Sequence, residues 1–205
     1  MKLIVISNPV DLPKEAVTIN ALFDAGLTHF HLRKPEAGTA ALRSLLDEID
    51  PLYNNRIALH QHHEIANQYN ISRLHYTEAV RQLSSIDSRR SLREKGYKLS
   101  TSVHSLSMIA NLADFNYVFY GPVFESISKM GYAGVVSPDF KLKKTRQQPE
   151  VIALGGVQVN RINNLNHMGF DGVAVLGALW NIPEEAVTTF NHIKTSIAAL
   201  KQKTE

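Results

Sequence analysis

Short apolar runs alternate with longer amphipathic stretches along the whole chain. Each run is a few residues long and rich in β-branched and aromatic side chains, which is typical of strands buried in a parallel sheet. The runs predicted as strands are Lys2–Ser7, His29–Arg33, Arg56–His60, Arg73–Tyr76, Lys98–Val103, Tyr117–Tyr120, Val151–Ala153 and Gly172–Val175. Parallel strands need a crossover connection, and the amphipathic stretches are long enough to supply it.

The amphipathic stretches carry apolar residues at helical spacing. They predict helices over Lys14–Ala25, Thr39–Ile49, Glu64–Tyr69, Ser88–Lys95, Leu106–Leu112, Val159–Met168 and Glu184–Lys201. Strict alternation of strand and helix, with no break in composition, predicts an α/β fold. We expect a single compact (β/α)8 TIM barrel that forms one domain over residues 1–205. A doubly wound open sheet is the alternative.

Composition agrees with one globular domain and excludes several classes of protein. The chain has 205 residues, of which 44% are hydrophobic, so it can bury a sizeable core. No apolar run approaches the roughly 20 residues that cross a bilayer, and the apolar start Met1–Ile6 is too short for a signal peptide. We therefore expect a cytoplasmic protein without membrane contact. The absence of cysteine excludes disulfides, thiolate metal sites and a cysteine nucleophile.

Charge gives little indication of a polyanionic partner. The formal net charge is only +3, and the basic residues are dispersed apart from the run Lys141–Arg146. That run carries no interleaved aromatic residues on which bases would stack, so we interpret it as a solvated segment. We expect no nucleic acid partner.

In a barrel of this kind the active site lies where the strands end and the βα loops begin. Polar residues at the predicted strand ends include Ser7, His31, Arg33, Lys34, His60, Gln61, His75, Thr77, Ser102 and His104. Glycines follow the last two strands, as Gly155-Gly156 and as Leu176-Gly177. Glycine lets backbone N–H groups approach a phosphate closely. The sixth strand is followed by Gly121-Pro122 and then by Ser126, Ser128 and Lys129, so we predict a site for a phosphorylated small molecule.

Histidines are the candidate proton carriers. His31 and His60 lie at strand ends, and an imidazole titrates near neutral pH. His60, His62 and His63 would share a metal only if their strand continued that far, and no cysteine or distant partner is evident, so we expect no metal site. His104 opens a helix, where we expect it to cap backbone donors.

Several segments together resemble the thiamin phosphate synthase family, which includes the TenI-type thiazole tautomerases. They are His31-Leu-Arg-Lys34, Ser102-Val-His-Ser105, Asp114-x-x-Tyr117, Gly121-Pro-Val-Phe-x-Ser-x-Ser-Lys129, Ala153-Leu-Gly-Gly156 and Gly169-Phe-Asp-Gly-Val-Ala-Val175. The resemblance covers nearly the whole chain. The segment from Gly121 to Lys129 is the most specific, whereas a double glycine occurs in many phosphate-binding barrels.

The resemblance implies a reaction and assigns roles. The synthase joins an aminopyrimidine diphosphate to a thiazole phosphate and releases pyrophosphate, and the tautomerase isomerises a thiazole carboxylate phosphate by moving protons. The residues that would bind the substrates and their phosphates are Arg33, Lys34, Ser102, Ser126, Ser128, Lys129, Gly155, Gly156, Leu176 and Gly177. Arg33, Ser102 and Lys129 would face the diphosphate. The family's lysine corresponds to Pro35 in this chain, and Lys34 is the residue next to it.

The chain departs from the synthase pattern at the positions that hold Mg²⁺. The Asn-Asp pair after the third strand reads His60-Gln61, the second aspartate falls near Val80, and Glu78 is the nearest carboxylate. Magnesium prefers carboxylate and water oxygens. We therefore expect no cofactor, with Mg²⁺ relevant only if synthase activity is retained.

The chain also departs from the tautomerase pattern. His31 and the segment Ser102–Ser105 resemble that branch, but its histidine after the sixth strand reads Pro122. The favoured hypothesis is a metal-independent thiazole phosphate isomerase or a divergent sibling, with His31 and His60 as catalytic residues. A Mg²⁺-dependent synthase and a non-catalytic phosphometabolite-binding protein are the alternatives. Such barrels often dimerise, so a homodimer is an additional expectation.

Overall fold

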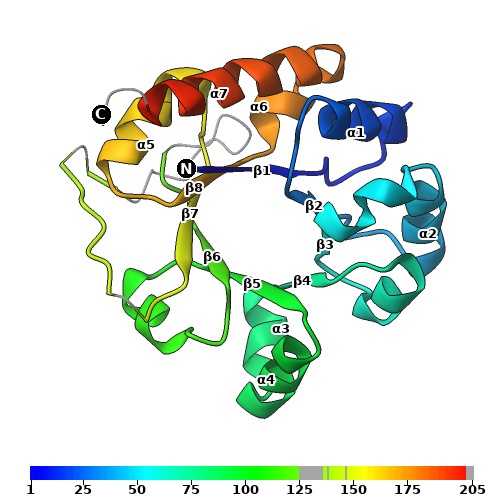
Figure 1. Cartoon of the computed structure of the whole chain (residues 1–205), viewed down its shortest axis with the longest axis horizontal. Coiled ribbons are helices and arrows are strands. Elements are labelled where there is room, and N and C mark those ends of the chain that lie inside the picture. The colour runs from blue at the N-terminus through cyan, green and yellow to red at the C-terminus, as the bar shows by residue number, and fades with distance from the viewer. Residues whose placement is uncertain (125–135, 138, 146, 202–205) are drawn as a thin grey trace.

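The eight predicted strands close into one parallel barrel (Figure 1). The computed structural model describes residues 1–124, 136–137, 139–145 and 147–201. The strands are β1 (Lys2–Ile6), β2 (Phe30–Leu32), β3 (Ile57–Leu59), β4 (Arg73–Tyr76), β5 (Lys98–Val103), β6 (Tyr117–Tyr120), β7 (Glu150–Leu154) and β8 (Gly172–Val175). They follow one another in chain order, and β8 pairs with β1 with Gly172 opposite Lys2. Because no strand is left at an edge, the open doubly wound sheet is excluded.

Helices surround the barrel on its outside (Figure 1). The α-helices are α1 (Glu15–Asp24), α2 (Thr39–Asp47), α3 (Glu78–Leu83), α4 (Ile86–Glu94), α5 (Ile162–His167), α6 (Gly177–Trp180) and α7 (Ala186–Lys201). The 3-10 helices are η1 (Pro51–Arg56), η2 (His63–Tyr69), η3 (Leu106–Asn111), η4 (Val159–Arg161) and η5 (Pro183–Glu185). Among the described residues, none of these helices is both long and apolar enough to cross a bilayer.

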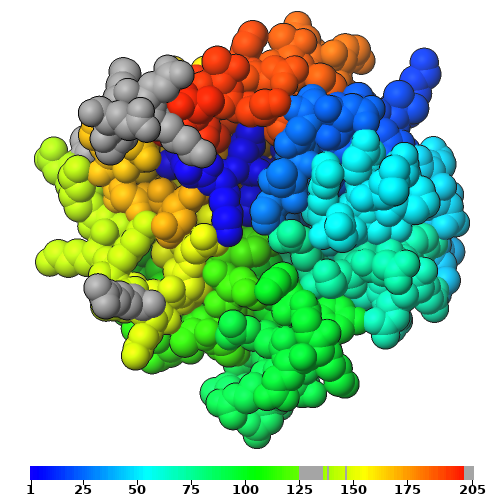
Figure 2. All heavy atoms as spheres, viewed as in Figure 1, coloured from blue at the N-terminus to red at the C-terminus, as the bar shows by residue number. Residues whose placement is uncertain are grey.

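The buried side chains form two layers, one inside the barrel and one between the barrel and the helices. The larger layer lies between strands and helices, where alternate strand residues such as Val5, Val118 and Val173 meet the apolar faces of the helices. The smaller layer fills the barrel and includes Ile4, Tyr117 and the neighbouring residues Phe119, Ile152 and Ala174. Figure 2 shows side chains meeting over the centre of the ring that the ribbon leaves open. The barrel interior is therefore a packed core and not a channel.

Candidate functional site

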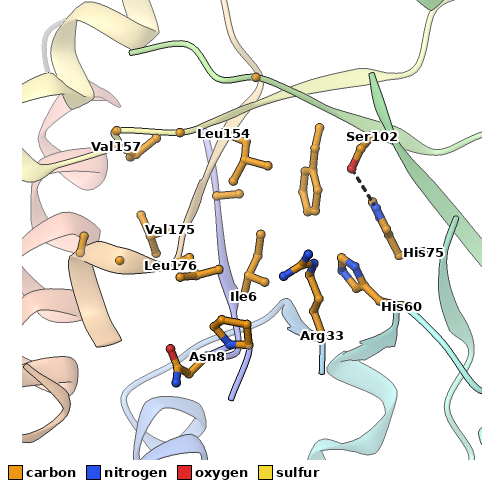
Figure 3. A pocket seen from close by; sticks show the side chains of 18 of the residues that line it. Ile6, Asn8, Arg33, His60, His75, Ser102, Leu154, Val157, Val175 and Leu176 are labelled. Carbon is orange, nitrogen blue, oxygen red and sulfur yellow. Dashed lines mark hydrogen bonds between the residues drawn. The ribbon is translucent and has the colours of Figure 1, made fainter. Parts of the chain in front are cut away.

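A cavity of about 750 Å³ opens at the carboxyl ends of the strands, as expected for this architecture. Its walls come from β1 to β8 and the loops that follow them. The lining residues are Ile6, Asn8, Pro9, Arg33, His60, His75, Thr77, Glu78, Ser102, Val103, His104, Phe119, Gly121, Leu154, Gly155, Gly156, Val157, Gln158, Ala174, Val175, Leu176, Gly177, Ala178 and Asn181. Figure 3 shows apolar side chains and bare backbone on one side, with Arg33, His60, His75 and Ser102 on the other.

Glycines form the wall after β7 and β8. Gly155 and Gly156 have φ of 94° and 64°, which L side chains rarely adopt. A Cβ on Gly155 would lie 2.8 Å from Cα of Pro122, so the site needs glycine for space as well. None of the described residues accepts a hydrogen bond from the N–H groups of Gly156 or Gly177. As far as the described part of the chain goes, these amides are left to bind an anion in the cavity.

Arg33 supplies positive charge across the cavity from the glycines. Its backbone is held at the end of β2 by Ser7, whose Oγ accepts from Arg33 N at 2.8 Å and donates to Arg33 O at 3.0 Å. The guanidinium forms no ion pair with any described residue. Its charge is therefore available to an anionic ligand.

Three buried histidines make the floor beneath Arg33. His60 and His75 line the cavity and stack on one another with ring centroids 4.0 Å apart. His31 lies behind them and is fully buried. Its Nδ1 is 2.8 Å from Nε2 of His60, and its Nε2 is 2.6 Å from the hydroxyl of Tyr117. Since Nε2 of His60 faces His31, Nδ1 of His60 is the nitrogen left for a ligand.

Serines of β5 hold the third ring. Nδ1 of His75 is 2.9 Å from Oγ of Ser100, and Nε2 is 3.0 Å from Oγ of Ser102, the bond drawn in Figure 3. Ser102 itself lines the cavity. The ring of His75 is thus fixed from both nitrogens, and its second partner reaches the ligand space.

Burial keeps this histidine floor uncharged. Loss of solvation lowers the pKa of His31 and of His60 well below the usual value, and the neighbouring His75 lowers both further. Loss of solvation also lowers the pKa of His75 to about 3 and raises the pKa of Tyr117 to about 12. The rings are neutral imidazoles at physiological pH, each with one donor and one acceptor nitrogen.

The hydrogen bonds of Lys34 and His104 correct two sequence predictions. Lys34 is buried outside the cavity lining, where its Nζ lies 2.5 Å from Oε2 of Glu15 and donates to the carbonyl of Val10 at 2.7 Å. An ammonium at that depth requires an anionic partner, so the structure places Lys34 in a buried ion pair and not against a substrate phosphate. His104 does not cap a helix, because its Nδ1 donates to the carbonyl of Gly121 at 2.7 Å.

Neither residue at the family's two Mg²⁺ positions, Gln61 or Val80, offers a carboxylate to the cavity. The side-chain amide of Gln61 donates to the carbonyl of Lys34, and Val80 lies outside the cavity lining and is 42% exposed. Glu78 lines the cavity and is the only carboxylate among the described lining residues, but its Oε1 lies 3.2 Å from the guanidinium of Arg81. Mg²⁺ would therefore meet one carboxylate that is already paired.

The other histidines of the third loop do not join His60. His62 is directed to Thr39, and His63 donates to the carbonyls of Leu59 and His75. Instead, His31, His60 and His75 have ligand atoms within 4.8 Å of one another. Of the predicted phosphate ligands, Arg33, Ser102, Gly155, Gly156, Leu176 and Gly177 line the cavity, and Ser126, Ser128 and Lys129 lie outside the described residues.

Comparison with known families agrees with this geometry. A family model described as thiamine monophosphate synthase matches residues 3–179. This chain belongs to that family. A thiamine-phosphate synthase from Salinibacter ruber is 36% identical over 78 residues, which cover 37% of this chain and 34% of the relative. That alignment spans about a third of the relative's length.

Solved structures extend the similarity over nearly the whole chain. A thiamine phosphate pyrophosphorylase from Bacteroides thetaiotaomicron is 26% identical, has a TM-score of 0.73, and is matched over 96% of this chain and 97% of its own. A thiamine phosphate pyrophosphorylase from Pyrococcus furiosus is 17% identical, with a TM-score of 0.75 and coverage of 97% and 96%. The second likeness supports the fold alone.

Proposed function

We propose that this chain binds a phosphorylated thiazole and rearranges protons on its ring without Mg²⁺, as a thiazole phosphate isomerase of the TenI type. The observation that carries the proposal is the composition of the cavity. Gly156 and Gly177, whose N–H groups have no acceptor among the described residues, line the cavity together with the neutral imidazoles of His60 and His75. Glu78 is the only carboxylate among the described lining residues.

One side of the cavity would bind the phosphate, and the other would contact the ring and move its protons. The amides after β7 and β8 would hold the phosphate, and Arg33 would attract the second anionic group of the substrate. A ring placed between them would lie against His60 and His75, within reach of Nδ1 of His60 and Oγ of Ser102. One of these atoms would accept a proton from the ring and the other would return one, so the reaction involves neither net oxidation nor a leaving group.

Burial changes the expected pH dependence. An unperturbed imidazole would give a limb near neutral pH, but the pKa of His60 is held well below its ordinary value by burial. The basic form of His60 must be present for activity. Activity of the free enzyme should thus fall only when the pH drops through that lowered pKa, and not near neutral pH as for an unperturbed histidine.

A Mg²⁺-dependent thiamin phosphate synthase is the second candidate function. It is favoured by the match to the family model and by the 26% identity to a thiamine phosphate pyrophosphorylase over nearly the whole chain. Its substrates would be a thiazole phosphate and an aminopyrimidine diphosphate. Glu78 would then have to leave Arg81 and join water molecules around the ion.

One pair of assays separates the candidates. Purified protein is given either the thiazole carboxylate phosphate alone or the thiazole phosphate with the pyrimidine diphosphate, each with Mg²⁺ and with a chelator. Isomerisation that survives the chelator supports the proposal. Strong Mg²⁺-dependent release of pyrophosphate would replace it with the synthase. Tight binding of thiazole phosphate without turnover in either assay would identify a binding protein.

A further inference from the structure

We propose that the interior of the barrel holds a continuous proton path that starts at His60, passes through His31, Tyr117, Ser100 and His75, and returns to the cavity at Ser102. The geometry points to this path because its consecutive members are hydrogen-bonded, apart from Tyr117 and Ser100, which are direct partners on neighbouring strands, and because both ends line the cavity. It deepens the proposed function, on which its catalytic use rests, since isomerisation removes a proton at one position and returns one at another.

The first half of the path descends from the cavity. His60 Nε2 lies 2.8 Å from His31 Nδ1, and His31 Nε2 lies 2.6 Å from the hydroxyl of Tyr117. His31 is fully buried and Tyr117 is 3% exposed, so bulk water does not compete for these bonds. Among the described residues, His31 is the only hydrogen-bond partner of the His60 ring, so a proton taken up there has this chain and the cavity as its ways out.

The second half rises to the cavity again. Tyr117 and Ser100 are direct partners on β6 and β5, and the Ser100 side chain is near enough to the Tyr117 hydroxyl to lower its pKa. Ser100 Oγ lies 2.9 Å from His75 Nδ1, and His75 Nε2 lies 3.0 Å from Ser102 Oγ. Hydroxyl hydrogens rotate, so each serine and the tyrosine can donate in either direction.

The transfer balances in protons and electron pairs. At the start each imidazole carries its proton on Nε2, and each member donates to the next one toward Ser102. Nδ1 of His60 accepts a proton from the substrate, the proton on each member moves to its neighbour, and the Ser102 hydroxyl gives its proton to the substrate. Every group is neutral before and after, and the imidazoles end with the proton on Nδ1. Exchange with cavity water returns the path to its first state.

Burial is what makes neutral transfer favourable here. The lowered pKa values of His31, His60 and His75 and the raised pKa of Tyr117 disfavour charged intermediates at each step. A metal ion is a poorer occupant of the three rings. The planes of His60 and His75 lie 21° apart in a stack, so their lone pairs do not converge on one point, and both nitrogens of His75 already have serine partners.

The path is tested first without substrate. Long-range ¹H–¹⁵N spectra of the full chain at pH 7 report which nitrogen of each imidazole is protonated. The path requires that His31, His60 and His75 be neutral and share one tautomer, all Nε2–H or all Nδ1–H. Mixed tautomers would interrupt the donor sequence and overturn the proposal. Binding of one equivalent of Zn²⁺ with loss of these signals would overturn it as well.

The second test breaks the path away from the cavity. Tyr117→Phe keeps the ring and removes the hydroxyl, so the isomerisation kcat should fall by roughly 100-fold or more while the Kd for thiazole phosphate changes less than about twofold. Ser100→Ala breaks the next bond and should give the same split. Tyr120→Phe, on the same strand but on its outward face, is the matched control. Wild-type kcat in both path variants would overturn the proposal.

The two tests also separate this inference from the proposed function. Inactive wild-type protein with the shared tautomer would contradict isomerase activity and leave the path supported as a physical network. Active wild-type protein with mixed tautomers would support the isomerase and overturn the path. A proton inventory measures kcat against the mole fraction of D2O. A curved plot for wild type and a linear plot for Tyr117→Phe would show that several protons move together in the wild-type protein.

Discussion

The two sides of the cavity recognise a ligand by different means. The side after β7 and β8 offers mainly backbone and apolar residues such as Leu154 and Leu176, with glycines where the chain turns and with uncharged amides at Gln158 and Asn181. The side after β2 to β5 consists of ionisable and hydroxyl side chains, among them Arg33, His60 and Ser102. A backbone site depends on φ and on space, whereas a side-chain site depends on protonation and on partners below the surface. Each side should therefore fail under a different perturbation.

The histidine side is sensitive to the loss of one imidazole. His60→Asn replaces the imidazole by an amide that cannot take up a proton, so isomerisation should slow by roughly 100- to 10,000-fold. Binding of thiazole phosphate should change little, because the phosphate amides lie on the other side. Steady-state kinetics and calorimetry measure the two effects separately.

His62→Asn is the matched control for that variant. His62 lies two residues further on, outside the cavity lining, and has φ of 55°, a conformation that asparagine tolerates. Its turnover should match that of wild type. Comparable losses in both variants would mean that His60 has no special role.

The glycine side is sensitive to added atoms. Gly155→Ala introduces a Cβ at φ 94° and 2.8 Å from Pro122, so the free energy of unfolding should fall by about 3 kcal/mol. Affinity for inorganic phosphate should fall with it, as the wall is displaced. Urea unfolding and calorimetry provide the two readings.

Gly38→Ala serves as the comparison for Gly155→Ala. Gly38 has φ of −77°, and a Cβ there would meet nothing within 4 Å. The change should be neutral or slightly stabilising. If Gly155→Ala were equally neutral, the glycine wall would not be a tightly fitted site.

Arg33 contributes a positive charge to the cavity. Arg33→Ala should weaken binding of a phosphorylated thiazole by roughly 1.5–3 kcal/mol, the contribution of a charge-assisted hydrogen bond. Arg90→Ala removes an exposed guanidinium from α4 and tests for a general effect of charge. Calorimetry at two salt concentrations measures both variants. Equal affinities in Arg33→Ala and wild type would remove Arg33 from the binding site.

Hydrophobic pattern predicted the barrel because each strand is short, buried and followed by a helical stretch. Several strands, such as β4, β5, β6 and β8, have the predicted bounds. The pattern was weaker for short connections. The predicted helices Glu64–Tyr69 and Leu106–Leu112 are 3-10 helices, and α3 was not predicted, because one or two turns show no clear periodicity.

Strand-end position predicted the charged, histidine and glycine residues that line the cavity, but not the partners beneath them. Lys34 was placed with the substrate-binding residues because it lies next to the position of the family's lysine, whereas its ion pair with Glu15 depends on a helix elsewhere in the sequence. His75 was recognised only as a strand end. Its stacking on His60 and its bonds to Ser100 and Ser102 arise from barrel closure and register, which sequence spacing does not encode.

Acid should weaken the fold through the histidine side and leave the glycine side unaffected. Burial lowers the pKa of His75 to about 3, so the folded protein leaves this ring neutral while the unfolded chain protonates it below about pH 6.5. The unfolded state therefore binds more protons between these pH values, and stability falls as the pH drops through that window.

His75 alone should account for about 2 kcal/mol of the unfolding free energy lost between pH 7 and pH 5. Urea unfolding at a series of pH values gives the wild-type curve. His75→Asn should flatten that curve by about this amount, because contributions from the carboxylates are common to both proteins, and His192→Asn on the exposed surface of α7 is the matched control. Parallel curves for wild type and His75→Asn would mean that the ring accepts a proton in the folded state, and the neutral histidine floor would have to be abandoned.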